Sequence, residues 1–302
     1  MTFNQEKTIR QTLENILNQK CDFNYIVKIY DDCSTDNTVA ICEQYSERNH
    51  TLFEIYINQK NIGAAKNFYQ ALGRIQCDYV AICEGDDYWI DQNKLQLQIE
   101  CLKQDSACSL SWTHALNIND SNNQEELSGH KRPKLIGLPY ILSNGWFIRT
   151  ATIVFRSNSL QVIPNWFQEI YSTDYFLQVL LLQNGYAIKL PVVTAVYRRH
   201  INGISHVNWL QHITRNEKII TFLDKLNEYL CNKHYKEITQ QQNSIKCELL
   251  FTVIFRRTQL PLIERVSIIA KYINLSTFYF LILKVLSALR MKITLLSQGY
   301  EK

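Results

Sequence analysis

The 302-residue sequence contains little glycine and proline, with nine glycines and five prolines. Disordered segments are enriched in these residues and poor in apolar ones, whereas 46% of this chain is hydrophobic. We therefore expect a folded chain with a sizeable core. No run of 18 uninterrupted apolar residues occurs, and residues 1–7 lack the apolar stretch of a signal peptide, so neither a spanning helix nor a leader is expected.

The sequence also lacks closely spaced pairs of cysteines. The nine cysteines, an odd number, are scattered without a Cys-x-x-Cys spacing, which argues against a disulfide framework or a zinc site. We therefore expect reduced thiols and a cytoplasmic location. The net charge of +4 is too small to indicate a nucleic-acid partner.

Strand-like and helix-like patterns alternate through the first part of the chain. Apolar strand patterns at 25–30, 52–57 and 79–83 are separated by single helix-like segments, which predicts an α/β protein with a parallel sheet between helices. Ligands bind beyond the carboxyl ends of the strands in such sheets. Polar clusters follow all three predicted strands: Asp31-Asp32, Asn61 to Gly63, and Glu84 to Asp87.

The third cluster, Glu84-Gly85-Asp86-Asp87, is the densest group of carboxylates. Hard divalent cations prefer oxygen ligands, and carboxylates this close repel one another unless a cation lies between them. Gly85 allows dihedral angles for a sharp turn that other residues avoid. An ordinary Asp-rich turn at a strand end is the alternative interpretation.

Other segments offer weaker signals. Asp174 precedes an apolar helix predicted over 175–183, where a carboxylate can also simply complement the helix dipole. The polar stretch 117–131 reads as a loop, and the aromatic and basic segment 145–150 suits either packing or stacking on a sugar ring. Short strands are expected at 109–116, 151–155, 186–189 and 192–197.

The composition changes near residue 206, where we place a domain boundary between 1–206 and 207–302. The second part has no strand pattern, and helices are expected at 207–230, 233–256 and 261–290. From residue 250 onward the chain has eight basic and two acidic residues among many apolar ones. This tail suits an interfacial helix on anionic lipid, and packing on the first domain is the alternative.

In chain order, these motifs resemble family 2 glycosyltransferases of the GT-A fold, particularly bacterial members that build surface polysaccharides. The resemblance covers residues 1–206 and rests on the ordered set Thr2-Phe3-Asn4, Asp31 to Asp36, Asn61-x-Gly63, Glu84 to Asp87, Asp174 and His200. It implies a Rossmann-like, mixed and mainly parallel sheet flanked by helices, followed here by a helical C-terminal extension.

The resemblance also implies roles for single residues. The acceptor hydroxyl would lose its proton to Asp174 as general base, and Mn²⁺ or Mg²⁺ would be held by Asp87 and His200. The implied substrate-binding residues are Thr2, Phe3, Asp32, Asn61, Lys66, Asp86 and Trp89. The implied reaction is inverting transfer of a sugar from a nucleotide-sugar, of which a UDP-sugar is favoured, to a glycan or lipid-linked glycan in lipopolysaccharide or capsule synthesis.

One departure from the family pattern concerns the strand that family members place directly before the segment matched by Thr2-Phe3-Asn4. That central strand has no counterpart in the sequence, so we expect the first strand to be truncated and the sheet incomplete. Either the true start lies upstream, or another segment fills the gap, or the product is a catalytically inactive nucleotide-sugar or glycan-binding protein. A sugar nucleotidyltransferase is a weaker alternative, because its Gly-rich N-terminal loop is missing. The identity of the sugar, the acceptor and the linkage is not predicted.

Overall fold

The computed structural model describes residues 1–119, 124–160, 162–199, 209–255 and 261–285, so His200 lies outside the described residues. The chain divides into two compact units, Met1–His206 and Val207–Lys302. The division falls where the composition changes. We refer to them as unit 1 and unit 2 and describe each by itself.

The first part of unit 1 alternates helices and strands as the apolar periodicity predicts. Its elements are α1 (Ile9–Leu17), β1 (Val27–Asp31), α2 (Thr38–Arg48), β2 (Phe53–Ile57), α3 (Ala64–Leu72) and β3 (Tyr79–Ala81). Asn4 lies upstream of α1 and does not cap it. Asn4 has a φ of 52°, and its Oδ1 accepts a hydrogen bond from the Thr35 N–H at 2.8 Å.

The second part of unit 1 is richer in strands than the sequence suggested. It contains β4 (Tyr88–Trp89), α4 (Lys94–Gln104), β5 (Cys108–Asn119), β6 (Gln124–Ser128), β7 (Leu135–Ile136), α5 (Leu138–Asn144), β8 (Val154–Arg156), α6 (Thr173–Leu182) and β9 (Tyr186–Arg199), with short 3-10 helices at Thr150–Thr152, Ser157–Ser159 and Asn165–Glu169. Residues 117–131 were wrongly expected to be a loop, because β6 pairs with the end of β5. The two strands expected at 186–197 are one strand whose register against β5 shifts near Pro191.

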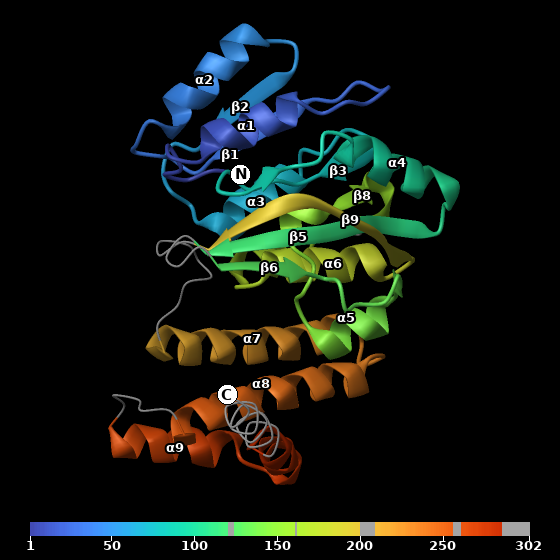
Figure 1. The fold of residues 1–302 in the computed structure, drawn as a ribbon. Coiled ribbons are helices and arrows are strands. Elements are labelled where there is room, and N and C mark those ends of the chain that lie inside the picture. The colour runs from blue at the N-terminus through green and yellow to red at the C-terminus, as the bar shows by residue number, and fades with distance from the viewer. Residues whose placement is uncertain (120–123, 161, 200–208, 256–260, 286–302) are drawn as a thin grey trace, which may run out of the picture. The chain divides into compact units, whose positions relative to one another are not determined.

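The strands form two sheets. Within the described ranges, one contains β1 and β2, and the other has the order β3-β8-β5-β9-β4, with β6 on β5 and β7 on β9. A mixed sheet is confirmed, but among the strands that the structure describes only β1–β2 and β5–β9 are parallel, so the parallel share is smaller than expected. Figure 1 shows β5 and β9 side by side, and the N-terminus between β1 and the larger sheet.

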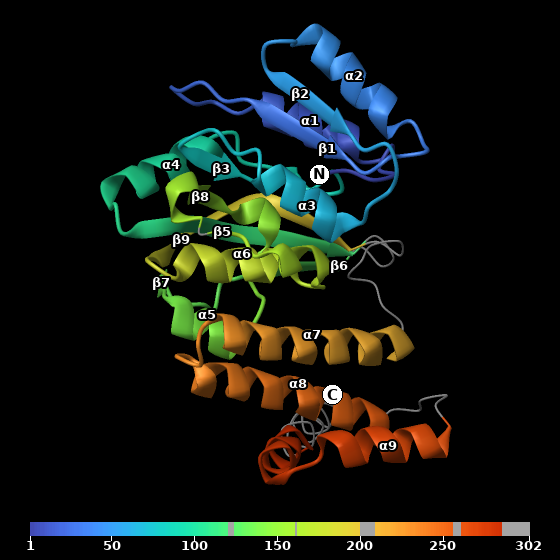
Figure 2. The same cartoon turned by 180° about the vertical axis from the view of Figure 1, so that it is seen from behind.

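Helices cover both faces of the larger sheet, as Figure 2 shows from behind, with α4 on one face and α6 on the other. Helix α4 contributes Leu95, Ile99 and Leu102 to a core with Val154 and Ala195 of the sheet. Every residue of α6 from Tyr175 to Leu182 is buried. A helix that is buried all round is anchored on every side, so its first turn is held firmly in place.

Unit 2 is helical, as the sequence predicts. Its helices are α7 (Trp209–Tyr229), α8 (Tyr235–Phe255) and α9 (Leu262–Tyr272), and a further helix covers Leu275–Val285. The single helix expected over 261–290 is wrong, because the last two described helices meet at a bend of 111°. Asn274 causes the break by capping the last helix: its Oδ1 accepts from the Thr277 N–H at 2.9 Å, and its own N–H donates to Thr277 Oγ1 at 2.8 Å.

In the part of the chain that the structure describes, no single helix has the length and apolarity to cross a bilayer. Two described helices, Ile263–Tyr272 and Leu275–Val285, meet the criteria of length and apolarity only when they are taken together as a bent pair.

Candidate active site

The carboxylate cluster lies in the turn between β3 and β4, and helix α1 holds its backbone. Thr12 Oγ1 donates to the carbonyl of Asp87 at 2.6 Å and lies 3.1 Å from the carbonyl of Gly85. A Cβ on Gly85 would lie 2.8 Å from Thr2 Cγ2 and 3.0 Å from Ile9 Cδ1. Glycine is therefore required here for close approach, and its φ is not positive, contrary to the dihedral argument made from the sequence.

The carboxylates of this turn disfavour one another's ionisation. Burial, and then the charge of Asp86, raise the pKa of Glu84 to about 7. Burial and the charges of Glu84 and Asp86 raise the pKa of Asp87 well above its ordinary value, although Asp87 Oδ1 accepts a hydrogen bond from the Arg198 N–H at 3.0 Å. A bound cation would relieve this repulsion, so the donor set fits a divalent metal ion.

The side chains alone do not form a complete metal cage. Across the described ranges, no group of three or more His, Cys, Asp and Glu side chains is placed to hold an ion. Mg²⁺ is commonly bound by one or two carboxylates together with substrate phosphates. Asp87, with Asp86 beside it, matches that incomplete kind of site.

Asp174 lies in the first turn of α6, and the fold brings it into the electrostatic field of the acidic turn. Burial raises the pKa of Asp174 to about 6, although hydrogen bonds from the Tyr175 N–H and from Trp146 and the charge of Arg149 act in the opposite direction. The charge of Asp174 in turn contributes to the raised pKa of Glu84. A buried carboxylate with a pKa near 6 is suited to accept a proton at neutral pH.

Arg149 is the cation that faces both acidic groups, and the sequence did not single it out. Its pKa is lowered by burial, and the charges of Asp87 and Asp174 act against that lowering. The guanidinium lies over the rings of Trp146 and Tyr197, at 4.5 and 4.3 Å from their centroids, and Nε donates to Asn117 Oδ1 at 3.1 Å. The aromatic and basic stretch 145–150 was the available signal.

Arg198 is a second cation near the acidic turn, and the sequence analysis did not identify it. Besides the backbone bond to Asp87, its guanidinium donates to the carbonyl of Asp86 at 2.8 Å and to the side chain of Gln11, and it lies 4.5 Å from the Tyr88 ring centroid. The end of β9 is thereby joined to α1 and to the acidic turn. The predicted ligand His200 follows directly after β9 but lies outside the described residues.

Asp32 forms a second part of the site at the end of β1. It is 3% exposed, and its carboxylate accepts hydrogen bonds from the N–H groups of Ile62 and Gly63, both at 2.8 Å, and from Asn58 Nδ2 at 3.0 Å. The carboxylate thus ties β1 to the loop after β2. Exposed Asn61 and Lys66 lie on that loop and on the following helix.

The two predicted residues near the N-terminus have different surroundings. Thr2 is buried, and its Oγ1 donates to Asp31 Oδ2 at 2.8 Å, whereas the Phe3 side chain is 44% exposed. Asp31 also accepts from the N–H and hydroxyl of Ser34, so it organises this segment. Phe3 is the one of the pair whose side chain is available to a ligand.

Trp89 has the contacts of a core residue, which differs from its predicted role in binding substrate. It is 4% exposed, its indole N–H donates to the carbonyl of Ala151 at 3.0 Å, and Lys94 Nζ lies 4.6 Å from its ring centroid. We therefore leave Trp89 out of the substrate-binding set.

Comparison with known proteins agrees with this arrangement. The family model for glycosyl transferase family 2 matches residues 1–163. An uncharacterized protein of Mycobacterium tuberculosis is 33% identical over 209 residues, which are 68% of this chain and 59% of that protein. The chain thus matches less than two thirds of the length of this relative.

Solved structures share the fold at low identity. Residues 1–349 of TarS from Staphylococcus aureus, in complex with UDP-GlcNAc, superpose with a TM-score of 0.61 at 17% identity, over 90% of this chain and 78% of that TarS fragment. The mannosyltransferase PcManGT of Pyrobaculum calidifontis, in complex with GDP-Man and Mn²⁺, superposes with a TM-score of 0.56 at 16% identity, over 95% of this chain and 78% of the PcManGT chain. The α/β fold, the carboxylate cluster and the match over more than half of the sequence lead to one conclusion: this chain belongs to glycosyl transferase family 2.

Proposed function

We propose that the chain is an inverting, metal-dependent glycosyltransferase. It would move a sugar from a nucleotide-sugar, most simply a UDP-sugar, to a hydroxyl of a glycan or lipid-linked glycan in surface polysaccharide synthesis. The observation that carries the proposal is the placement of Asp174, a carboxylate with a pKa of about 6, within the electrostatic field of the acidic turn 84–87.

Asp174 is the proposed general base. At neutral pH most of its population is ionised, so it can take the proton of the acceptor hydroxyl while the oxygen attacks the anomeric carbon and the nucleoside diphosphate leaves. Tyr175 N–H and Trp146 hold the carboxylate by hydrogen bonds, and the buried α6 fixes its position. Arg149 interacts electrostatically with both Asp174 and Asp87, so it would keep the base ionised and attract the diphosphate.

The proposed cofactor is Mn²⁺ or Mg²⁺, held by Asp87 with His200 as the predicted second ligand. A bound cation would neutralise the charge that develops on the leaving diphosphate. The mutual repulsion of Glu84, Asp86 and Asp87 supports this assignment, and the structural neighbour PcManGT was solved with Mn²⁺. Asp32, Asn61, Lys66, Asp86 and Phe3 remain the proposed donor-binding residues.

Asp174→Asn tests the proposal directly. The amide keeps the size of the side chain and can still accept a hydrogen bond from Tyr175, but it cannot take a proton. We expect release of nucleoside diphosphate in the presence of acceptor to fall by about 10²-fold or more, while donor binding measured by calorimetry is preserved. Glu47→Gln is the matched control, because it removes an exposed carboxylate on α2.

Three outcomes distinguish the alternatives. Transfer that survives Asp174→Asn would mean that another group is the base. Donor turnover that is the same in Mn²⁺ and in EDTA, or unchanged in Asp87→Ala, would refute the metal assignment. Donor binding without turnover by the unaltered chain, across UDP-, GDP- and dTDP-sugars, would favour the non-catalytic binding protein.

We also propose that unit 2 makes peripheral contact with the inner face of the cell membrane, where a lipid-linked acceptor would reside. Its last two described helices expose large apolar side chains, including Ile263 (80%) and Leu275 (91%), with Phe278, Tyr279 and Leu283 also exposed. Lys271 and Lys284 lie on the same helices. Exposed apolar and basic residues together are typical of helices that bind anionic lipid.

Liposome flotation tests this contact. Leu275→Asp should reduce recovery with vesicles that contain anionic lipid by about threefold or more, since burying a carboxylate in the interface is unfavourable. Val162→Asp is the control, because Val162 is 89% exposed in unit 1. Equal recovery of both variants and of the unaltered chain in the soluble fraction would refute membrane contact.

A further inference from the structure

Lys94, in the first turn of α4, is a buried cation that the proposed mechanism does not use. Its side chain is 0% exposed, and burial lowers the pKa of its ammonium group to about 7, although the charges of Cys83 and Asp91 act in the opposite direction. A cation in a protein interior is unfavourable unless other groups compensate for the water that it has lost. Lys94 therefore needs specific partners in the core.

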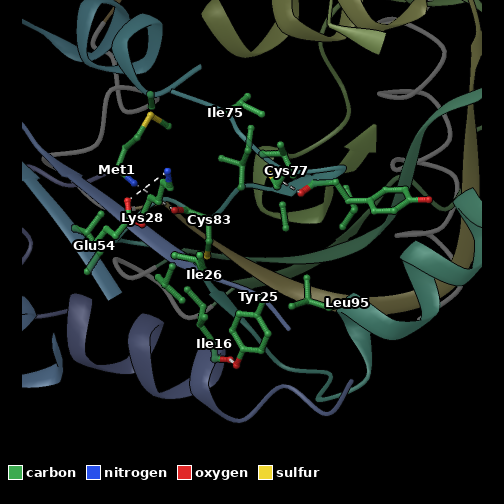
Figure 3. Close-up of a pocket in the computed structure, with 18 of the residues that line it drawn as sticks. Met1, Ile16, Tyr25, Ile26, Lys28, Glu54, Ile75, Cys77, Cys83 and Leu95 are labelled. Atoms are coloured by element: carbon green, nitrogen blue, oxygen red, sulfur yellow. Dashed lines mark hydrogen bonds and ion pairs between the residues drawn. The ribbon is translucent and has the colours of Figure 1, made fainter. Parts of the chain in front are cut away.

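The cavity of unit 1 does not provide these partners. Of the described residues of α4, Leu95, Ile99 and Lys103 line this cavity of about 830 Å³, whereas Lys94 and Gln98 do not. Figure 3 shows the Leu95 side chain among the lining residues. The contacts of Lys94 and Gln98 are therefore made within the packed part of the core.

Two core side chains contact the ammonium group. Lys94 Nζ donates to Gln98 Oε1 at 2.7 Å and lies 4.6 Å from the centroid of the Trp89 ring. Residues four apart on a helix lie on the same face, so α4 itself brings Lys94 and Gln98 together. The face of an indole ring attracts a cation. One ammonium group thus holds both side chains.

The bond from Lys94 also decides which way the Gln98 amide faces. An ammonium group can only donate, so it must meet the amide oxygen, and the amide nitrogen is then turned toward acceptors. Gln98 Nε2 donates to the carbonyl of Ser111 at 3.0 Å and to that of Thr152 at 2.9 Å. Carbonyls can only accept, so both ends of the amide specify the same orientation. Without the ammonium group, the amide oxygen would lose a buried hydrogen bond that fixes this orientation.

Trp89 and Gln98 in turn hold the short 3-10 helix that ends at Thr152. The Trp89 indole N–H donates to the carbonyl of Ala151 at 3.0 Å, and Gln98 bonds to the next carbonyl along the chain. A 3-10 helix has poor hydrogen-bond geometry of its own. The two side chains that contact the ammonium group therefore fix where this helix lies.

Arg149 directly precedes this helix and is tied to it. The Arg149 carbonyl accepts hydrogen bonds from the Thr152 N–H at 2.9 Å and from Thr152 Oγ1 at 2.7 Å. The Arg149 guanidinium interacts electrostatically with Asp87 and Asp174. The 3-10 helix thus sets the backbone position from which the guanidinium reaches these carboxylates.

We propose that Lys94 is a positioning residue for Arg149. Its ammonium group fixes Trp89 and Gln98, and these side chains hold the 3-10 helix. The helix in turn presents the Arg149 guanidinium to Asp174. Lys94 acts from the core, through Arg149, and its importance for transfer rests on the proposed function of Asp174 as the base.

NMR of the Asp174 carboxyl carbon tests this role without metal, donor or acceptor. Lys94→Met keeps an unbranched side chain but removes the ammonium donor. We expect the titration midpoint of Asp174 to rise by about 0.5 pH units or more, because a displaced Arg149 stabilises the carboxylate less. In the Arg149→Gln background, the same substitution should cause no further rise, because the residue through which Lys94 acts is already gone.

Leu102→Ala is the matched control for general loosening of the core. Leu102 is 0% exposed on the same helix, and its truncation leaves a cavity but removes no bond between Lys94 and Arg149. We expect its Asp174 midpoint to equal that of the unaltered chain. If Lys94→Met does not yield folded protein, Gln98→Met must raise the midpoint in the same way, because it keeps the ammonium group and removes the bond to Thr152.

An unmoved midpoint in Lys94→Met would overturn the proposal. A further rise in the Arg149→Gln background would also overturn it, because the ammonium group would then act on Asp174 directly through its charge. An equal rise in Leu102→Ala would do the same, because it would indicate general loosening. Since the titration is measured without donor or acceptor, it tests the positioning of Arg149 even if the chain transfers no sugar.

Discussion

Asp174→Asn should stabilise unit 1 at neutral pH while it removes transfer. The pKa of Asp174 is raised from 3.8 to about 6, so the folded chain binds this proton more tightly than the unfolded chain. Ionisation of Asp174 therefore lowers the free energy of unfolding progressively as pH rises from 3.8 to about 6. Above that range this contribution to stability is lost completely. A shift of about two units corresponds to roughly 3 kcal/mol.

The amide variant carries no such penalty. We expect its free energy of unfolding at pH 7.5 to exceed that of the unaltered chain by about 1–3 kcal/mol, and the difference to shrink toward zero near pH 4. Urea denaturation in EDTA measures it, and tryptophan fluorescence follows unit 1 because four of the five tryptophans lie there. Equal stability at pH 7.5, or an advantage that stays constant down to pH 4, would refute the reasoning. Glu47→Gln should show neither effect.

Three further predictions concern other residues. Arg149→Gln should lower kcat by about 10–100-fold and move the acid limb of the pH–rate profile upward, because the cation that lowers the pKa of Asp174 is lost; an unmoved limb would contradict this role. Unit 1 should gain stability from pH 7 to 10, because burial lowers the pKa of Lys94 to about 7, and Lys94→Met should abolish that slope in denaturation experiments. Gly85→Ala should cost about 1–3 kcal/mol through overpacking, whereas Gly73→Ala, whose Cβ would meet nothing closer than 3.6 Å, should be neutral in the same assay.

Apart from the two-residue strand β4, the elements of the first 104 residues were predictable because each has one dominant period. Apolar residues recur at helical spacing in α1 and α3, and β1 to β3 are short apolar runs that stop at polar turns. Strands at the surface were harder to find. Strand β6 has the sequence Gln-Glu-Glu-Leu-Ser and is almost entirely exposed, so its pairing with β5 leaves no apolar signal.

The candidate site was predictable where one short stretch carries it. The turn 84–87 and Asp174 were found from local sequence and family resemblance, but Arg149 acts through distant partners on β5, β9 and α6, which no local pattern reveals. The family resemblance placed Trp89 among the substrate-binding residues, and only the fold shows that its side chain packs in the core.

The free cysteines offer a practical consequence. Most thiols of the chain are shielded: burial raises the pKa of Cys42 to about 12 and that of Cys108 to about 11, which keeps them protonated and slow to react. Cys77 and Cys231 are the two exposed thiols, one in each unit. Maleimide probes should attach there first, and the distance between a pair of such labels would report how the two units are arranged while sugar donors and lipid vesicles are added.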